Sequence, residues 1–123
     1  MVTEKTLVDF INCYFRVFLT ARPKIISQPL SMELMQGRTI ILDCNMTSKP
    51  LPTIIWLKNG NLLKQNNNIT ISIINAYKNS RLIIYNASIS DQGLYRCNGT
   101  NLAGSTLTNA ANITIYSKWP RNC

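Results

Sequence analysis

The amino-acid sequence predicts an all-β domain in which two antiparallel sheets form a sandwich. Three observations lead to this prediction. From residue 21 onward, apolar runs of four to six residues follow one another, they are rich in β-branched residues, and turn-forming residues separate them. Seven or more short strands with frequent turns are typical of a sandwich or a barrel.

Each expected strand is bounded by residues that favour turns. Gln36-Gly37, Asn59-Gly60 and Ala103-Gly104 mark turns, while Pro50 and Pro52 keep one connection out of helix and sheet. The expected strands are Lys24–Ser27, Thr39–Cys44, Thr53–Leu57, Ile69–Ile74, Arg81–Tyr85, Leu94–Asn98 and Asn112–Tyr116.

Alternation along three of these strands assigns a face to each side chain, because successive residues of a strand point to opposite sides. Two cysteines and a tryptophan fall on the inward side. The inward set is Ile40, Leu42, Cys44, Ile54, Trp56, Tyr95 and Cys97, and the outward set is Ile41, Asp43, Ile55, Leu57, Leu94, Arg96 and Asn98.

Several of these residues also match a known signature. Cys44, Trp56 and Cys97 match a Cys…Trp…Cys frame, Asp91 to Cys97 match Asp-x-Gly-x-Tyr-x-Cys at Asp91, Gly93, Tyr95 and Cys97, and Leu82 lies on the strand that precedes this signature. On these motifs the sequence resembles the immunoglobulin superfamily, specifically its I-set.

The resemblance covers residues 21–117 and has clear structural implications. It implies an immunoglobulin-like β-sandwich with Greek-key topology and a Cys44–Cys97 disulfide packed against Trp56. It also implies that the Tyr95 hydroxyl bonds to nearby backbone and that Gly93 occupies a turn that a side chain would crowd. Such a disulfide forms in an oxidising compartment, so we expect an extracellular protein, either secreted or the ectodomain of a membrane protein.

Two narrower resemblances point to growth-factor signalling. The run from Trp56 to Gly60, with the preceding Pro50-Leu51-Pro52-Thr53, looks like the second immunoglobulin domain of fibroblast growth factor receptors. The segments from Lys58 to Asn61, Ala87-Ser88 and Ala111 to Ile115 look like the immunoglobulin domain of neuregulins. Both families imply contact with heparan sulfate.

The parts of the chain outside residues 21–117 are expected to lie outside the fold. Residues 1–20 have apolar residues at helical spacing, but Asp9 and Arg16 interrupt the apolar centre that a secretory signal requires, so this segment is either a degenerate signal or a flank of the domain. Residues 118–123 read as a linker or the start of a further module. We therefore expect Cys13 and Cys123 not to pair within the domain.

Five Asn-x-Ser/Thr triplets are candidates for N-linked glycosylation. Alternation places Asn45, Asn98 and Asn112 on outward faces, with Asn98 and Asn112 on the sheet that contains Trp56 and with Asn45 on the opposite sheet. The five candidates are Asn45, Asn68, Asn86, Asn98 and Asn112.

The chain is strongly basic, with 13 Lys and Arg against 5 Asp and Glu and a net charge of +8. This balance favours acidic partners such as sulfated glycans. Lys49, Lys58, Lys64 and Arg96 come from segments around the predicted Trp56–Cys97 sheet, so we expect them to form a heparan sulfate contact on one side of the domain. Only the charge points to nucleic acid, and we expect none to bind.

Catalysis and metal binding are not expected. The sequence contains no histidine, which removes the commonest general base and metal ligand, and its 4 cysteines form no Cys-x-x-Cys pair. We expect no cofactor. No run of 18 uncharged apolar residues exists, so any membrane association would come from parts outside this chain.

Three functions are compatible with these sequence features. The first is an extracellular recognition module that binds a protein partner. The second is a structural spacer in a string of immunoglobulin domains. The third is an intracellular domain of the muscle type, against which the glycosylation triplets and the disulfide frame count.

Overall fold

The computed structural model describes residues 20–74 and 79–118. Residues 1–19 of the N-terminal segment, which include Cys13, and Cys123 lie outside the described residues. The strands are β1 (Ala21–Ser27), β2 (Met32–Met35), β3 (Ile40–Lys49), β4 (Thr53–Lys58), β5 (Asn61–Leu62), β6 (Ile69–Ile74), β7 (Asn79–Ile84), β8 (Gly93–Asn101), β9 (Gly104–Leu107) and β10 (Ala111–Tyr116), and a 3-10 helix, Ile89–Asp91, precedes β8.

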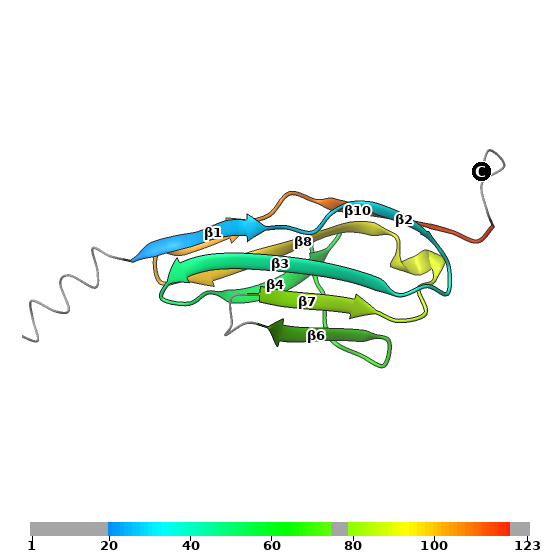
Figure 1. Cartoon of the computed structure of the whole chain (residues 1–123), viewed down its shortest axis with the longest axis horizontal. Coiled ribbons are helices and arrows are strands. Elements are labelled where there is room, and N and C mark those ends of the chain that lie inside the picture. Colours follow the sequence, from blue (N-terminus) through cyan, green and yellow to red (C-terminus); the bar gives the residue numbers. More distant parts are fainter. Residues whose placement is uncertain (1–19, 75–78, 119–123) are drawn as a thin grey trace, which may run out of the picture.

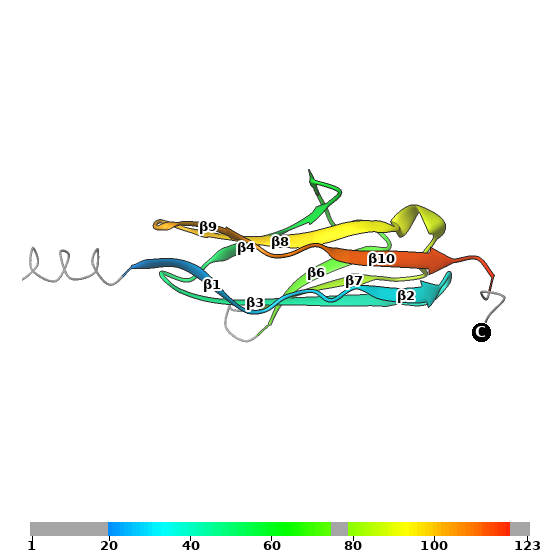
Figure 2. The ribbon, with the colours of Figure 1, turned by 90° about the horizontal axis from the view of Figure 1, so that it is seen from above.

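The strands form two sheets that lie face to face, which confirms the predicted sandwich (Figures 1 and 2). The four-stranded sheet has the order β1-β3-β7-β6, and the six-stranded sheet has the order β2-β10-β8-β4-β5, with β9 paired to β8. The pairs are antiparallel except that β10 and β2 run parallel. The beginning of β1 and the end of β10 lie at opposite ends of the molecule (Figure 1).

All seven predicted strands are present; Ile69–Ile74 has the predicted bounds, and the other six have shifted ends. The prediction missed β2, β5 and β9. Strand β2 has the sequence MELM, whose residues individually favour helix, and it is held as a strand by parallel pairing with β10. Strand β5 has only 2 residues. Strand β9 begins at the glycine of the Ala103-Gly104 turn and has only 4 residues, which is too short to show alternation.

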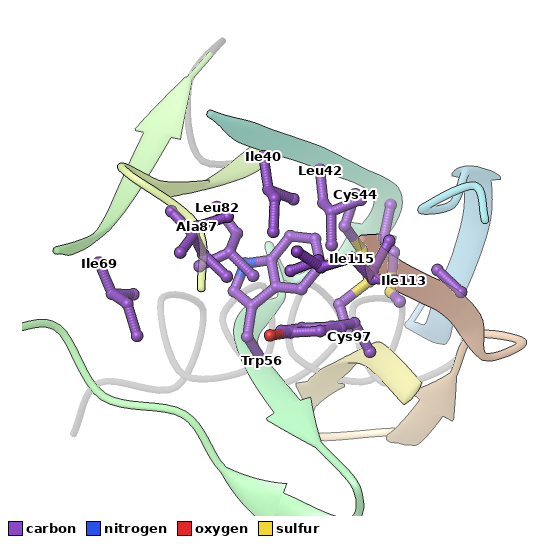
Figure 3. Packing of buried hydrophobic residues seen from close by; sticks show 14 residues of the cluster. Ile40, Leu42, Cys44, Trp56, Ile69, Leu82, Ala87, Cys97, Ile113 and Ile115 are labelled. Atoms are coloured by element: carbon purple, nitrogen blue, oxygen red, sulfur yellow. A yellow bond between two sulfur atoms is a disulfide. The ribbon is translucent and has the colours of Figure 1, made fainter. Parts of the chain in front are cut away.

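The predicted alternation is confirmed. In β3, Ile40, Leu42 and Cys44 are buried while Ile41 is exposed. The same pattern places Trp56 and Cys97 inside, and Figure 3 shows how they meet Leu82 and Ile113 from both sheets. Inward side chains of two facing sheets interdigitate to form the core of a sandwich, and burial of their apolar surface is the main favourable term in its stability.

Candidate interaction site

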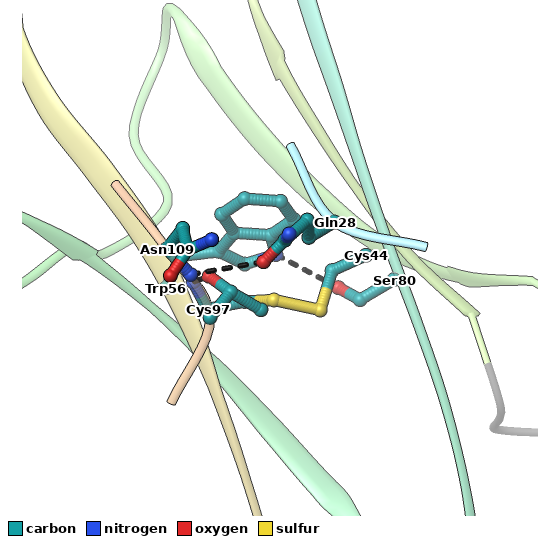
Figure 4. The surroundings of a disulfide bond; sticks show 7 residues. Gln28, Cys44, Trp56, Ser80, Cys97 and Asn109 are labelled. Carbon is teal, nitrogen blue, oxygen red and sulfur yellow. Dashed lines mark hydrogen bonds between the residues drawn. A yellow bond between two sulfur atoms is a disulfide. The ribbon is translucent and has the colours of Figure 1, made fainter. Parts of the chain in front are cut away.

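The two sheets are joined through the centre of the core by a disulfide and an indole hydrogen bond. Cys44 of β3 and Cys97 of β8 form the disulfide, and both side chains are fully buried (Figure 4). Trp56 is also 0% exposed, and its Nε1 donates to the Ser80 hydroxyl at 2.9 Å. Because Ser80 belongs to the four-stranded sheet and Trp56 to the six-stranded one, this bond satisfies a buried donor across the sandwich.

The corner before β8 fixes the start of the strand that carries Leu94 and Arg96. The Tyr95 hydroxyl donates to the Asp91 carbonyl at 2.5 Å, and the Asp91 carboxylate accepts the Ser88 amide at 2.8 Å. Burial, and secondarily the charge of Asp91, raise the pKa of Tyr95 well above its ordinary value, so this phenol stays protonated. Gly93 has φ +155°, and a Cβ there would lie 2.8 Å from Asn59 Oδ1.

Strand β8 presents its outward residues at the middle of an apolar surface on the six-stranded sheet. We define the apolar face by five side chains on the outer side of β4, β5, β8 and β9. Four of them are exposed, Ile55 at 38%, Leu62 at 54%, Leu94 at 47% and Leu107 at 47%, and the fifth, Leu57, is half-buried.

Strand register brings these side chains together although they are far apart in sequence. Asn98 pairs with both Ile55 and Leu107, and Leu57 pairs with both Arg96 and Leu62. Arg96 therefore lies beside Leu57 and between Leu94 and Asn98 along β8. Directly opposed side chains in an antiparallel pair are about 5 Å apart, so the apolar side chains are grouped around the Arg96 guanidinium, with Asn98 between Ile55 and Leu107.

This composition suits a protein partner better than a small ligand. Exposed apolar patches of several side chains mark interaction sites on soluble proteins. Arginine and large apolar residues are characteristic of interface cores, where the guanidinium can form several hydrogen bonds at once. The surface is that of a sheet, so it can accept another broad surface.

The candidate glycosylation residues lie at different positions relative to this face. Asn98 lies within it and is half-buried, with its Oδ1 enclosed and without a hydrogen-bond partner. Asn112 is exposed and pairs with Leu94 at the margin of the face. Asn45 lies half-buried on β3 of the other sheet, and Asn68 and Asn86 are exposed at the ends of β6 and β7.

The expectation that Lys49, Lys58, Lys64 and Arg96 gather on one side is wrong. Lys49 ends β3 in the four-stranded sheet, at the opposite end of β4 from Lys58. Lys58 has the same strand parity as the inward Trp56; its Nζ donates to the Ser90 carbonyl at 2.5 Å and lies 6.0 Å from the centre of the Tyr95 ring. Lys58 and Arg96 both lie in the six-stranded sheet but point to opposite faces of it, and the exposed Lys64 follows β5.

The acidic residues in the described part of the chain all have structural partners. Asp43 forms an ion pair with Arg81 at 2.8 Å, Glu33 accepts the Tyr116 hydroxyl at 2.9 Å, and Asp91 caps the 3-10 helix. Residues 20–74 and 79–118 contain no group of three or more potential metal ligands. Within the same residues, the structure has no helix of the length and apolarity that crossing a bilayer requires.

The residue pattern alone identified only part of the candidate site. Alternation had placed Ile55, Leu57, Leu94 and Arg96 outward, as observed. Leu62 and Leu107 were missed because the short strands β5 and β9 that carry them were not predicted. The inward direction of Lys58 could have been found, since it is two residues after Trp56 on one strand.

Comparison with known proteins adds relatives and structural neighbours. The family model of the immunoglobulin I-set domain matches residues 23–115. The chain is 34% identical over 95 residues to the peroxidasin homolog of Homo sapiens, covering 77% of this chain and 6% of that protein. It is 44% identical over 71 residues to hemicentin-1 of Mus musculus, covering 58% of this chain and 1% of that protein.

Another relative and a solved structure are also similar to this chain over one immunoglobulin domain. The chain is 31% identical over 103 residues to contactin-5 of Gallus gallus, covering 76% of this chain and 10% of that protein. It thus spans a tenth or less of the length of these relatives. Among solved structures, titin domain M7 superimposes with a TM-score of 0.72 at 27% identity, covering 79% of this chain and 96% of that chain.

Proposed function

Because this chain belongs to the immunoglobulin I-set family, we propose that it is an extracellular recognition module that binds a protein partner through the apolar face. The observation that carries the proposal is the grouping of exposed Ile55, Leu62, Leu94 and Leu107 on four strands around Arg96. A spacer with no partner of its own has no need of such a surface, whose exposure to water is unfavourable.

An extracellular location is part of the same proposal. The Cys44–Cys97 disulfide is enclosed in the core, and stable disulfides of this kind are typical of oxidising compartments. The five Asn-x-Ser/Thr triplets also favour a secretory route. A glycan on Asn98 would stand in the middle of the apolar face, so the proposal includes a bare Asn98 when the partner is bound.

The narrower role in growth-factor signalling remains a prediction. It is supported by the short motifs from Trp56 to Gly60 and from Ala111 to Ile115 that resemble fibroblast growth factor receptors and neuregulins. The first of these motifs lies on β4 and the turn after it, next to the apolar face, so the two proposals concern neighbouring residues.

The recognition proposal can be tested with a matched pair of substitutions. Leu94→Arg puts a second charge into the apolar face, and Ile41→Arg makes the same change on the outer side of the four-stranded sheet, where the native exposure is 48% against 47% for Leu94. In a binding assay of the multimerised chain on a panel of cultured cells, we expect Leu94→Arg to weaken binding about tenfold or more, as central interface residues do. We expect Ile41→Arg to bind as the unmodified chain does.

Two results would contradict the recognition proposal. Equal loss in both variants would show that added positive charge, rather than the apolar face, controls binding. Absence of binding to every cell type by the unmodified chain would favour the spacer. A variant with Asn98→Gln separates a glycan effect from an effect of the face itself.

Heparan sulfate binding is a second proposal, and the structure favours a different location for it. Arg22 and Lys24 are exposed on β1, and Lys49, also exposed, pairs with Ala21 beside them. The Arg22 guanidinium lies next to Gly104 at the β8–β9 turn. These three cations thus share one end of the sandwich, whereas Asp43, Glu33 and Asp91 are engaged elsewhere.

The location of this second site can be tested by two charge reversals of equal size. We expect Lys24→Glu with Lys49→Glu to elute from heparin at clearly lower salt than Lys58→Glu with Lys64→Glu, because only the first pair removes cations from the shared end. Salt elution on one column measures both. Equal shifts would mean that net charge alone governs retention and that no glycan site exists at this end.

A further inference from the structure

Strand β6 forms one edge of the four-stranded sheet, and its free side carries unusual protection. Its sequence, from Ile69 to Ile74, contains four isoleucines and no charged residue or proline. Exposed edges of this kind are templates for pairing with another chain, and proteins commonly block them with charges, prolines or bulges. None of these devices occurs within β6.

The direction of the backbone groups along β6 follows from two sets of hydrogen bonds. The Tyr85 amide donates to the Asn68 carbonyl at 2.8 Å, so residues in register with Asn68, namely Thr70 and Ser72, direct their backbone groups to β7. The alternate residues Ile69, Ile71 and Ile73 direct theirs to the free edge.

Two side chains from the preceding loop occupy that edge. Asn66 Oδ1 accepts the Ile69 amide at 2.9 Å, and Gln65 Oε1 accepts the Ile71 amide at 3.0 Å. The backbone amide of Asn66 in turn donates to the Ile69 carbonyl at 3.1 Å. The loop therefore makes the bonds that a further strand would make along the first half of β6. Ile73, in the second half, is 63% exposed.

The sequence of β6 matches itself in the antiparallel direction. A two-fold axis at Ile71 would pair Ile69 with Ile73 and Thr70 with Ser72. Apolar residues then meet apolar residues and hydroxyl residues meet hydroxyl residues. The same axis makes Ile69, Ile71 and Ile73 the hydrogen-bonded positions of the new pair, which are the positions whose backbone groups already face the edge.

We propose that β6 is a self-complementary edge for pairing with a second copy of this chain, and that Gln65 and Asn66 hold it closed. With the two side chains removed, the backbone amides of Ile69 and Ile71 become available. The remaining bond from the Asn66 backbone amide to the Ile69 carbonyl is exchanged for one to the second copy, and two four-stranded sheets join into one. Because each copy contributes one β6 edge to a two-fold pair, the product is a closed dimer and not a filament.

The first experiment compares two double variants of the unglycosylated full chain, with Cys13 and Cys123 replaced by serine to exclude unrelated disulfides. Gln65→Ala with Asn66→Ala opens the edge, and Asn61→Ala with Asn67→Ala is the control, because it removes two exposed amide side chains near the same loop. By sedimentation equilibrium we expect the dissociation constant of the dimer to fall at least tenfold in the opened variant only. Circular dichroism verifies that each variant is folded.

A third variant tests the edge itself. Adding Ile73→Lys to the opened variant places a charge at the exposed half of β6, and we expect it to restore the monomer. A single Gln65→Ala variant, which loses only the bond to Ile71, is expected to dimerise to an intermediate degree and serves if the double variant does not fold.

The register is tested by disulfide trapping in the opened variant. Thr70 and Ser72 would form a non-hydrogen-bonded pair with Cα atoms about 4.5 Å apart, within the range of a disulfide. A mixture of the Thr70→Cys and Ser72→Cys chains should therefore cross-link to a mixed dimer on non-reducing electrophoresis, faster than either chain alone. A monomeric opened variant, a dimer that Ile73→Lys leaves intact, open-ended aggregates, or equal cross-linking of all mixtures would each overturn the proposal.

Discussion

Replacing both Cys44 and Cys97 with alanine is expected to lower the free energy of unfolding by about 4 kcal/mol. The disulfide links residues 53 positions apart, and the chain-entropy model assigns roughly 3 kcal/mol to a 15-residue loop and about 4.7 kcal/mol to a 100-residue loop. A domain of this size has a total stability of about 5–15 kcal/mol, so the loss would leave the folded state marginal.

Urea unfolding followed by circular dichroism measures this effect. The unmodified chain in reducing buffer is a second route to the same state, because it loses the bond while keeping the sulfur atoms in the core. The control is Cys13→Ser with Cys123→Ser, which is expected to leave the unfolding midpoint unchanged. A loss below about 1 kcal/mol for the alanine pair would contradict the loop-closure argument.

The second large effect is expected at Trp56. Trp56→Ala should cost about 3–5 kcal/mol, the range for removal of a large buried aromatic side chain. The indole is 0% exposed and packs in the core cluster formed by both sheets, so a cavity opens on both sides of the missing ring. Equilibrium unfolding monitored at several wavelengths gives the free energy directly.

Two companion variants separate packing from hydrogen bonding. Ser80→Ala leaves the buried Trp56 Nε1 without its acceptor and should cost about 1–3 kcal/mol. Trp56→Phe keeps much of the apolar volume and leaves the Ser80 hydroxyl unpaired, so it should fall between Ser80→Ala and Trp56→Ala. If Trp56→Ala proved no more costly than Ser80→Ala, the stabilising role assigned to ring packing would be wrong.

The buried positions of the residues in these two predictions could be assigned from the sequence, because alternation with a period of two indicates which side of a strand is buried. Cys44, Trp56 and Cys97 each lie on a strand long enough to show an inner and an outer face. Short strands carry no such signal. Strand β2 exists because β10 pairs with it in parallel, and that contact is about 80 residues away in sequence, with Met32 opposite Ile113.

The candidate sites likewise combine residues whose direction could be predicted from the sequence with residues whose position could not. The outward direction of Leu94 and Arg96 follows from the inward Tyr95 and Cys97. The path of the loop before β6, which brings Gln65 and Asn66 onto the strand edge, depends on backbone geometry that no residue pattern encodes. The distribution of cations failed as a prediction because it requires the relative placement of strand ends in two different sheets.

The opposite placement of the start of β1 and the end of β10 determines what repetition of this domain would achieve (Figure 1). Because the chain enters the domain at one end and leaves it at the other, each domain in a tandem array adds the length of its long axis to the array. Strand β3, with 10 residues, is about 33 Å long at the usual rise per residue. Each copy would therefore extend a tandem array by roughly that distance, and the number of copies would set how far from its anchor the apolar face of the last domain could reach.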